Sequence, residues 1–430
     1  MFGKCQSDKR RGNTGSVLII VQNLPVPLDR RVWQEATSLR AAGFEVAVIC
    51  PKSRIYNKKY ERLEGVYVYR YQRPLEAGSS IVGYGIEFVY CWLMTFALAC
   101  KVYLQHPFQV IQACSPPDTY FALALLFRPL GVKFVFDHHD LSPDLYVAKG
   151  HKARGLIYRL LLFLEKATFQ TADLVITTNE SYRAVAKQRG GLPAQKLVVV
   201  RSGPRRNWAR DYRSNPSLKQ KRKYLVVFVG QIGVQDGVDY LLRAIAVYDR
   251  TSSKDTLFAI IGDGPSHRQM VRMAAELEIE DSVRFTGCFS DDRLCGYLAT
   301  ADVCVDPAPW TQFNNVSTMN KVVEYMAFGK PIVAFDLLEH RRSAQQAAYY
   351  VEPNDCSKFS GAIREVLEDK QLQDRMSQFA VDRFDHDLAW EISERHLLNG
   401  YASVFAKASS LPISREAHAQ DNRTKVIVRP

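Results

Sequence analysis

The sequence lacks the cysteine patterns that mark metal sites and disulfide frameworks. Its nine cysteines occur singly, and no CxxC pair is present. Closely paired cysteines are typical of zinc and redox motifs, and an even, regularly spaced set is typical of small secreted domains. We therefore expect reduced and mostly buried thiols in a cytosolic protein.

Long uninterrupted apolar runs are also missing. The most apolar stretch is 81–104, in which Glu87 and Lys101 leave only Phe88–Cys100 free of charge. A membrane span needs roughly 20 apolar residues. Two interpretations remain open, a core helix or a helix lying on a membrane surface, which the aromatic residues of this stretch would suit. The N-terminus has no apolar segment followed by a small-residue cleavage site, so secretion is not expected.

Two common nucleotide-binding motifs are absent. No GxGxxG follows the first predicted strand of either half, and GDGPSH from Gly262 has the wrong spacing. No GxxxxGK[ST] is present, because the GKP at Gly329 follows a predicted helix instead of preceding one. A dinucleotide-dependent oxidoreductase and a P-loop enzyme therefore lose their main support.

Acidic residues are fewer than basic ones. The chain has 57 Lys and Arg against 45 Asp and Glu, a net charge of +12, and part of the excess lies in the leader and in residues 201–223. Such a balance suits nucleic acid, phosphate-rich ligands or an anionic membrane surface. No helix-turn-helix, zinc-finger or RNA-recognition signature accompanies it, so no nucleic-acid partner is expected.

What the chain does contain is an alternation of apolar strands and helical segments that occurs twice. The first series runs from SVLIIVQ to KLVVVRSG and the second from YLVVFVG to IVAF. A chain of 430 residues is too long for one core. Continuous apolar strands alternating with helices predict α/β domains with parallel, doubly wound sheets.

The predicted organisation has six parts. They are a polar basic leader (1–15), a first Rossmann-like domain (16–204), a basic linker (205–223), a second Rossmann-like domain (224–385), a helix containing a tryptophan (386–405) and a disordered tail (406–430). The linker KQKRK is also explained by simple solvation.

The stretch STMNKVVEYMAFGKPIVAFD, 317–336, combines a helix start, two opposite charges and a helix stop. With Ser317 or Thr318 as N-cap, Lys321 and Glu324 lie one turn apart near the helix N-terminus, which favours anions. Lys321 could hold a phosphate, and Glu324 could accept both hydroxyls of a ribose. On spacing alone, an ordinary surface ion pair is the more frequent explanation.

In order along the chain, these features resemble the nucleotide-sugar glycosyltransferases of the GT-B fold, specifically the retaining family four. The resemblance covers roughly Val17 to Phe405 and rests on LRAAGFEVAVIC, FDHHDLSPDLY, VRSGP, VGQIGVQDGVDYLLRA, IIGDGP, VRFTG and EYMAFGKPIVAFD. It implies two domains facing across a cleft, with the acceptor on the first and the donor on the second. It also implies that the terminal helix returns to the first domain.

The resemblance further implies which residues bind the donor. The implied donor-nucleotide residues are Gly230, Gly262, Gly264, Gly287, Cys288, Ser317, Thr318, Lys321 and Glu324. Glu324 would hold the ribose, while Gly262, Gly264 and the backbone near Gly287 and Cys288 would lie beside the base, where small residues allow close approach. A simple turn also explains GDGP.

The histidine pair in FDHHDLSPD allows two interpretations. A zinc site needs three or four ligands, and no partner cluster is visible in the sequence, so no metal is expected. The resemblance implies that His139 faces the donor sugar, that Asp140 follows it and that His138 is a packing neighbour. It also implies front-side transfer, in which the leaving phosphate takes the acceptor's proton and no cofactor is needed. His139, Lys321 and Glu324 are thus the candidate catalytic residues.

Three positions depart from the family pattern. Gln231 and Asp236 stand where an arginine and a lysine are usual, so two phosphate-binding cations are missing. Val316 replaces the first of two paired glutamates. The donor sugar would then be held differently, with Asn314, Asn315 and the backbone near Ser317 as candidates.

The acceptor site is less defined. Asp29 and Arg31, together with Asp140, are the candidate acceptor-binding residues, and Arg31 would meet the diphosphate of a polyprenyl-linked glycan. A solvated arginine is the alternative. The resulting hypothesis is a hexosyltransferase for surface polysaccharide at the inner face of the cell membrane. The alternatives are a nucleotide-sugar epimerase of the same fold and a nucleotide-binding but catalytically silent relative.

Overall fold

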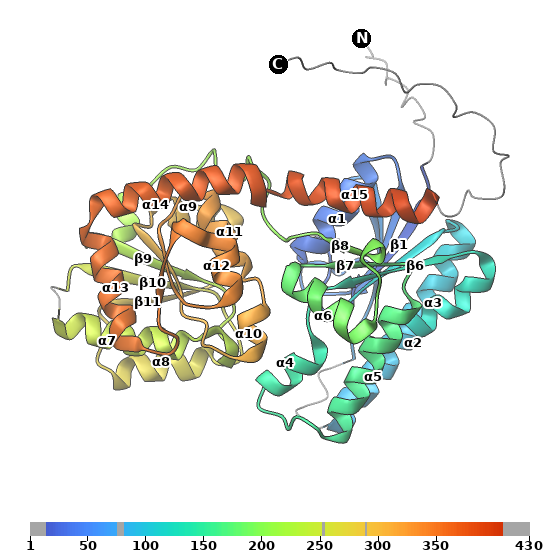
Figure 1. The fold of residues 1–430 in the computed structure, drawn as a ribbon, viewed down its shortest axis with the longest axis horizontal. Coiled ribbons are helices and arrows are strands. Elements are labelled where there is room, and N and C mark those ends of the chain that lie inside the picture. The colour runs from blue at the N-terminus through green and yellow to red at the C-terminus, as the bar shows by residue number, and fades with distance from the viewer. Residues whose placement is uncertain (1–13, 75–80, 252–253, 289, 407–430) are drawn as a thin grey trace, which may run out of the picture.

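The computed structural model describes residues 14–74, 81–251, 254–288 and 290–406. The predicted leader up to residue 13 and the predicted tail from residue 407 lie outside this range. Two α/β units lie side by side, and one long helical segment at the C-terminal end runs along both (Figure 1).

The first unit is built on a sheet of eight strands in the order β3-β4-β2-β1-β5-β6-β7-β8. Their bounds are β1 Ser16–Ile20, β2 Glu45–Pro51, β3 Tyr60–Leu63, β4 Val66–Tyr71, β5 Val110–Cys114, β6 Lys133–His138, β7 Leu174–Thr177 and β8 Leu197–Val199. All neighbours pair in parallel except β3 and β4.

The second unit has a sheet of six strands in the order β11-β10-β9-β12-β13-β14, all parallel. Their bounds are β9 Tyr224–Val229, β10 Thr256–Ile261, β11 Val283–Gly287, β12 Val303–Asp306, β13 Ile332–Phe335 and β14 Ala348–Val351. Two doubly wound sheets confirm the predicted α/β fold class.

Helices connect the strands and cover both sheets. In the first unit they are α1 Arg30–Ala41, α2 Ile81–Gln105, α3 Phe121–Phe127, α4 Ser142–Ala148, α5 Leu156–Thr171 and α6 Glu180–Gly190. Next come α7 Val238–Thr251, α8 His267–Glu276, α9 Asp291–Thr300, α10 Gln312–Val316, α11 Asn320–Ala327, α12 Leu338–Ala344, α13 Cys356–Glu368, α14 Lys370–Arg383 and α15 Trp390–Ala406. Five short 3-10 turns, η1 Arg128–Leu130, η2 Ala194–Lys196, η3 Pro216–Lys219, η4 Val234–Asp236 and η5 Gln345–Ala347, occur between them, and the π-helical turn η6 Phe384–Leu388 precedes α15.

The continuous apolar strands explain why both faces of each sheet are covered. In the first unit, side chains of α2, α3 and α5 share one buried cluster, whereas α1 and α15 share the cluster on the opposite face. In the second unit, α7, α8 and α13 cover one face, and α9 and α11 cover the other. A strand buried on both faces needs apolar side chains at successive positions, as the sequence has.

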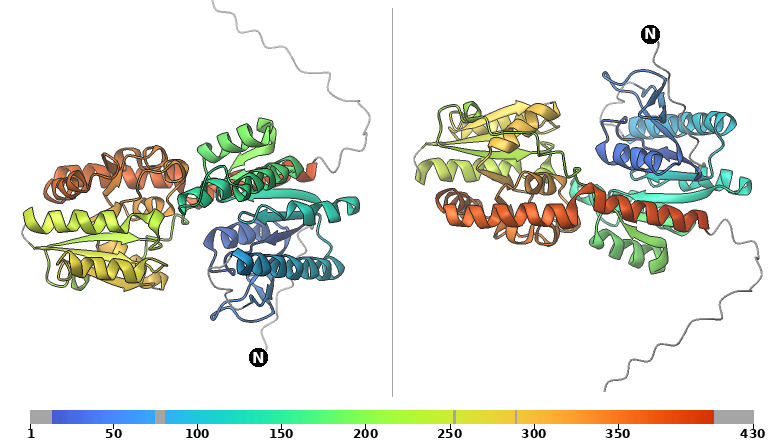
Figure 2. Two further views of the ribbon diagram at one scale, coloured as in Figure 1. Left: turned by 90° about the horizontal axis from the view of Figure 1, so that it is seen from below. Right: turned by 90° about the horizontal axis from the view of Figure 1, so that it is seen from above.

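The C-terminal helix returns to the first unit, as predicted. Figure 2 shows α14 and α15 running along one side of the molecule and spanning both units. Trp390 is fully buried, and its indole N–H donates to the Ser38 hydroxyl of α1 at 3.0 Å. Tyr401 donates its hydroxyl hydrogen to Gln112 of β5. Burial of these large aromatic side chains holds α15 against the first sheet.

The β3–β4 hairpin was not expected, because the sequence analysis predicted only parallel strands. Leu63 pairs with Val66, and the two residues between them, Glu64 and Gly65, have φ values of 47° and 84°. Two successive positive φ angles are the signature of a tight hairpin turn. An isolated Glu-Gly pair was too weak a signal to find it.

Candidate functional site

Helix α11 does not begin where the sequence predicted. Its N-cap is Met319, which makes no side-chain capping bond, and Ser317 instead ends α10. The predicted N-cap is wrong because both hydroxyls have other partners. Ser317 Oγ lies 2.9 Å from the Tyr182 hydroxyl, and Thr318 Oγ1 accepts from Asn179 Nδ2 at 2.9 Å. Tyr182 and Asn179 belong to the first unit, so these contacts join the two units.

Lys321 is buried close to the start of α11. Its side chain is 9% exposed, and its Nζ lies 3.8 Å from Asp306 Oδ1 and 3.9 Å from Asp236 Oδ1. Nζ also lies 4.3 Å from the centre of the Phe228 ring, yet it has no hydrogen-bond partner among the described residues. An ammonium group has three donors, and burying them unpaired is costly. The position therefore suits an anionic oxygen as a further partner.

Glu324 is paired across the domain boundary and not with Lys321. Arg30 of α1 donates from Nη1 to Glu324 Oε1 at 3.3 Å, and its other terminal nitrogen contacts Asp291 of α9. Burial raises the pKa of Glu324, whereas Arg30 acts to lower it. The interpretation of Lys321 and Glu324 as one surface ion pair is therefore wrong.

A buried charge network lies behind Lys321. Asp306 is fully buried at the end of β12, and its Oδ2 lies 3.2 Å from Nε2 of His340. Burial acts to raise the pKa of Asp306, but Lys321 and His340 outweigh burial and lower it. Burial raises the pKa of Asp236, which accepts a hydrogen bond from the Gly233 N–H at 3.1 Å. Asp236, which stands where the family usually has a lysine, therefore faces Lys321.

The four predicted glycines lie at the carboxyl edge of the second sheet. The Gly262 N–H donates to the Gly287 carbonyl at 3.1 Å, and the Gly230 N–H donates to the carbonyl of Ile261 at 3.0 Å. A Cβ on Gly262 would lie 1.8 Å from the Gly230 carbonyl oxygen, and one on Gly264 would lie 2.6 Å from a neighbouring carbonyl oxygen. Close loop packing thus suffices to require glycine at both positions. Cys288, next in sequence after β11, is exposed.

Gly230 connects these loops to Lys321. A Cβ at Gly230 would lie 2.9 Å from Lys321 Nζ, and the φ of this glycine is +152°. The loop after β9 therefore passes directly over the ammonium group. In open α/β sheets, ligands bind outside the carboxyl ends of the strands. The structure brings the glycines and Lys321 together at such an edge.

His139 lies at the corresponding edge of the first sheet, after β6. Its Nε2 is 2.6 Å from Asp137 Oδ2, and its main-chain N–H donates to the Ser115 hydroxyl at 2.8 Å. His138 is fully buried, with its ring centre 5.0 Å from that of Phe169. The two histidines therefore point into different surroundings.

Arg31 is buried, so the solvated alternative is wrong, whereas its contact with an acceptor stays a prediction. Its Nη2 lies 2.9 Å from Asp137 Oδ1 and 3.1 Å from Glu35 Oε1, and Nη1 donates to the Val200 carbonyl at 2.7 Å. The guanidinium is buried because α1 packs on the sheet beside these carboxylates. The neighbouring candidate Asp29 is the N-cap of α1.

Asp140 follows His139 after β6 of the first sheet, whereas Val316 is the last residue of α10 in the second unit. The main-chain N–H of Asp140 donates to Ser115 Oγ at 3.2 Å, and burial raises the pKa of the Asp140 carboxyl group. Val316, which replaces a family glutamate, turns its carbonyl to Asn179 Nδ2 at 3.0 Å. The first unit thus covers the backbone at the sugar end of the predicted site.

One group of described residues, Cys114, Asp137 and His139, has the ligand atoms for a metal ion, all within 4.8 Å of one another. Burial raises the pKa of the Cys114 thiol well above its ordinary value, so the thiol keeps its proton. Arg31 already supplies positive charge to Asp137. The chemistry of this group favours a structural ion pair over a metal site.

Sequence reasoning missed Arg30, Asp137, Asp306 and His340. Asp137 and Asp306 lie at the carboxyl ends of buried strands, β6 and β12, a position at which functional carboxylates gather in α/β folds. That signal was present in the sequence. Arg30 and His340 had no comparable local signal, because their partners are distant in the chain.

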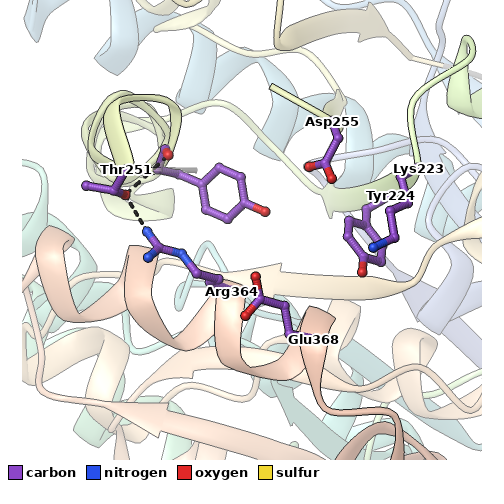
Figure 3. Close-up of a pocket in the computed structure, with 7 residues that line it drawn as sticks. Lys223, Tyr224, Thr251, Asp255, Arg364 and Glu368 are labelled. Atoms are coloured by element: carbon purple, nitrogen blue, oxygen red, sulfur yellow. Dashed lines mark hydrogen bonds between the residues drawn. The ribbon is translucent and has the colours of Figure 1, made fainter. Parts of the chain in front are cut away.

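One cavity adjoins this arrangement, and another lies apart from it. One of about 370 Å³ lies beside the loop after β9 and is lined by Gly233, Gln235 and Trp310 of the second unit and Ala148 of the first. Another, of about 450 Å³, is lined by Lys223, Tyr224, Tyr248, Thr251, Asp255, Arg364 and Glu368 (Figure 3). It lies at the amino ends of β9 and β10, opposite the edge that holds Lys321, and does not belong to the same site.

Two family models match the chain. One, described as glycosyl transferase 4-like domain, matches residues 28–203, and the other, glycosyl transferases group 1, matches residues 223–369. The two matches correspond to the two α/β units.

Curated relatives are similar over part of their length. Alpha-D-kanosaminyltransferase of Streptomyces kanamyceticus is 25% identical over 159 residues, 36% of this chain and 40% of that protein. Lipopolysaccharide core biosynthesis glycosyltransferase LpsD of Rhizobium meliloti is 26% identical over 188 residues, 42% of this chain and 49% of that protein. The chain spans about half the length of the first curated relatives it matches, between 40% and 56%.

Solved structures share the fold over most of the chain. Sucrose-phosphate synthase from Thermosynechococcus elongatus has a TM-score of 0.71 and 17% identity, covering 91% of this chain and 100% of its own. Anabaena HepE in complex with UDP-glucose has a TM-score of 0.67 and 16% identity, covering 90% of this chain and 100% of its own. At such identities the likeness concerns the fold.

Proposed function

Because the chain belongs to the group 1 glycosyltransferases, the retaining family four with the GT-B fold, we propose that it transfers a hexose-type sugar from a nucleotide-diphosphate donor to a glycan acceptor. The observation that carries the proposal is the buried ammonium of Lys321 at the carboxyl edge of the second sheet, which has no hydrogen-bond partner among the described residues and faces two carboxylates at 3.8 and 3.9 Å. The diphosphate of the donor would supply the oxygens that this group lacks.

The donor would lie along the carboxyl edge of the second sheet. Its base would meet the loops at Gly262 and Gly287, and Glu324 would accept from the ribose hydroxyls once Arg30 is displaced. Lys321 would stabilise the charge that develops on the leaving diphosphate. Gln231 and Asp236 stand where relatives have two phosphate-binding cations, so Lys321 would carry a larger share of phosphate binding here. Asp236 itself lies 3.9 Å from Lys321.

Chemistry would take place between the two sheets. His139 is held by Asp137 at 2.6 Å and would orient the donor sugar. The glycosidic bond to the diphosphate breaks as the acceptor hydroxyl attacks from the same side, and the leaving phosphate takes the hydroxyl proton. Such a step needs neither a protein nucleophile nor a metal ion.

The proposed acceptor is a glycan carried on a polyprenyl diphosphate, in surface polysaccharide synthesis at the inner face of the cell membrane. The similarity to a lipopolysaccharide core glycosyltransferase supports this pathway. The basic net charge of +12 supports an anionic surface nearby.

A screen of UDP, GDP and dTDP for a rise in melting temperature tests the donor site. A ligand that binds only the native state stabilises it by mass action, so one of the three should raise the melting temperature. Replacing Lys321 by alanine should remove that rise. If no nucleotide shifts the transition of the wild-type protein, the donor site is wrongly assigned.

Asp236 beside Lys321 favours a second candidate, a relative that binds nucleotide but does not transfer sugar. Radiolabelled donor with a lipid-linked acceptor extract separates the two candidates. Transfer of label to lipid supports the enzyme, whereas nucleotide binding without transfer supports the silent relative. Donor incubated alone should stay unchanged, because an epimerised sugar would indicate an epimerase instead.

A further inference from the structure

The carboxylate of Asp137 lies directly behind His139 and is fully buried near the carboxyl end of β6. Its Oδ2 lies 2.6 Å from His139 Nε2, and its Oδ1 accepts from Arg31 Nη2 at 2.9 Å. One oxygen therefore faces the imidazole and the other faces a guanidinium. The carboxylate joins α1 to the candidate site through these two contacts.

The contact between Asp137 and His139 needs one proton, and the surroundings decide which group carries it. Burial acts to raise the pKa of Asp137, but Arg31 and His139 outweigh burial and lower it. The carboxylate is therefore ionised and can only accept hydrogen bonds. It follows that His139 donates from Nε2, so the neutral ring carries no proton on Nδ1.

Further buried groups hold this carboxylate in place. Gln112 donates from Nε2 to Glu35 Oε2 at 2.6 Å and to Asp137 Oδ2 at 3.2 Å, and Tyr401 of α15 donates its hydroxyl hydrogen to Gln112. Burial and the charge of Asp137 raise the pKa of Glu35 well above its ordinary value, so Glu35 keeps its proton. The charges that remain are those of Arg31 and Asp137, which oppose each other.

His139 has one open side. Its main-chain N–H is held by the Ser115 hydroxyl at 2.8 Å, and 16% of its side chain is exposed. Nδ1 has no hydrogen-bond partner among the described residues, and it is not one of their buried unpaired atoms. The unprotonated nitrogen of the ring therefore faces solvent at the carboxyl edge of the first sheet.

We propose that Asp137, kept ionised by Arg31, is a positioning residue that fixes His139 with its proton on Nε2 and presents Nδ1 as an acceptor to a hydroxyl group of the donor sugar. The inference deepens the proposed function and rests on it for the identity of the ligand. What it adds is the position of the ring proton and the residues that determine it.

The position of this proton matters for the rate of transfer. As the bond to the leaving diphosphate breaks, the sugar gains positive charge and its hydroxyl groups become better hydrogen-bond donors. A nitrogen that accepts from such a hydroxyl group stabilises the transition state more than the ground state, whereas a nitrogen that donates to it does not. The proposed tautomer should therefore affect the rate of transfer more than the binding of the nucleotide.

The same contacts also hold α1 against the sheet, so a matched pair of variants is needed to separate the two roles. Asp137→Asn and Glu35→Gln each replace a buried carboxyl group by an amide of the same shape. Both carboxyl groups contact Arg31 and Gln112, but only that of Asp137 contacts His139. A purely structural role would make the two variants alike.

Asp137→Asn should reverse the hydrogen bond to the ring. The amide oxygen should stay on Arg31, because a guanidinium cannot accept a hydrogen bond. The amide nitrogen then faces Nε2 of His139, which must accept, and the ring proton moves to Nδ1. Glu35→Gln should leave the ring as it is in the wild type.

Heteronuclear NMR of the full chain, isotope-labelled at the histidine ring nitrogens, measures the tautomer. At about pH 8 the ring is compared in its neutral form, since the ordinary pKa of histidine is about 6.5. The signal that disappears in His139→Gln identifies this residue among the nine histidines. A proton on Nδ1 in the wild type would overturn the inference, and this measurement needs no variant of Asp137. An unchanged tautomer in Asp137→Asn, or the same change in Glu35→Gln, would also overturn it.

Sugar transfer with saturating donor gives the second readout. Asp137→Asn should lower the rate by about tenfold or more. It should keep the melting-temperature shift caused by the nucleotide, which the proposed site places against the second unit. Glu35→Gln should keep both the rate and the shift. A moved proton with an unchanged rate would show that Nδ1 does not accept from the sugar.

The outcome can be separated from that of the proposed function. If the wild-type protein transfers no sugar from any of the donors tested, the proposed function is wrong. The NMR comparison of the wild type, Asp137→Asn and Glu35→Gln still decides whether Asp137 fixes the ring, because it requires neither donor nor acceptor.

Discussion

At the scale of single residues, the chain concentrates its unusual chemistry around Lys321. A buried ammonium without a hydrogen-bond partner faces two carboxylates at nearly 4 Å, Asp306 and Asp236. Because these distances exceed the length of a hydrogen bond, the N–H groups of Lys321 can still donate to a closer anionic oxygen. With the usual arginine and lysine absent, the proposed donor site would depend on this single group for phosphate more than typical relatives do.

We expect Lys321→Ala to reduce sugar transfer by about 100-fold to 1000-fold, because one stabilising contact to the leaving group is worth about 2.7–4 kcal/mol. Initial rates with saturating donor measure the effect. Lys358→Ala, an exposed lysine on α13, is the control and should leave the rate unchanged. Circular dichroism should show that both variants are folded. Near-normal turnover by Lys321→Ala would contradict the role assigned to it.

The acid dependence of stability should involve Asp306. Its folded pKa is lowered, so the ionised carboxylate stabilises the protein above the unfolded pKa of about 4, and this contribution is lost as the pH falls through the folded pKa. The stability gap between the wild type and Asp306→Asn should be largest near pH 7 and should narrow below about pH 4. Urea titrations between these pH values measure it. The exposed Asp211→Asn should show no such gap.

At the scale of elements, α15 supplies part of the core of the first unit. It packs with α1 on one face of the first sheet, through Trp390 and Tyr401, although it follows the second unit in sequence. The first core is therefore incomplete until the C-terminal end of the chain has been added. Truncation before α15 would expose that face.

We expect Trp390→Ala to lower the free energy of unfolding by about 3–5 kcal/mol, because it leaves a large cavity and removes the hydrogen bond to Ser38. The loss should affect the first unit most, so hydrogen exchange should rise in α1 before it rises in the second sheet. Arg395→Ala, an exposed position of the same helix, is the control. Equal loss of hydrogen-exchange protection in both units would show that α15 does not stabilise the first unit in particular.

At the scale of the whole molecule, the two units meet through polar contacts that involve the candidate site itself. Arg30 pairs with Glu324, and Tyr182 and Asn179 contact the hydroxyl groups of Ser317 and Thr318. A donor that uses Glu324 must displace Arg30. In the proposed site, donor binding would therefore be linked to the separation of the two units.

We expect Arg30→Ala to strengthen donor-nucleotide binding by about 1.4-fold to fivefold, since a solvent-accessible ion pair is worth about 0.2–1 kcal/mol. Isothermal titration with the nucleotide found in the melting screen measures the change. Lys187→Ala, an exposed residue of α6, serves as the control. Weaker binding in Arg30→Ala would mean that the arginine contacts the donor instead of competing with it.

The sequence alone was sufficient for the fold class. Apolar strands alternating with helices specify two parallel sheets, because strands buried on both faces require this pattern. Local glycine and helix-stop signals also placed Gly329 correctly, with a φ of 62° after α11. These features depend on residues that are close in sequence.

Only the tertiary structure decided which charges meet. Arg31 was expected at an acceptor or in solvent, yet it lies buried against Asp137, 106 residues away. Ser317 was expected to cap α11, yet its hydroxyl contacts Tyr182, 135 residues away. The pairing of Glu324 with Arg30 likewise joins two units whose strands do not pair. Such partners are set by the packing of elements that are distant in sequence. The interaction between two charges depends on their distance in space and not on their separation along the chain.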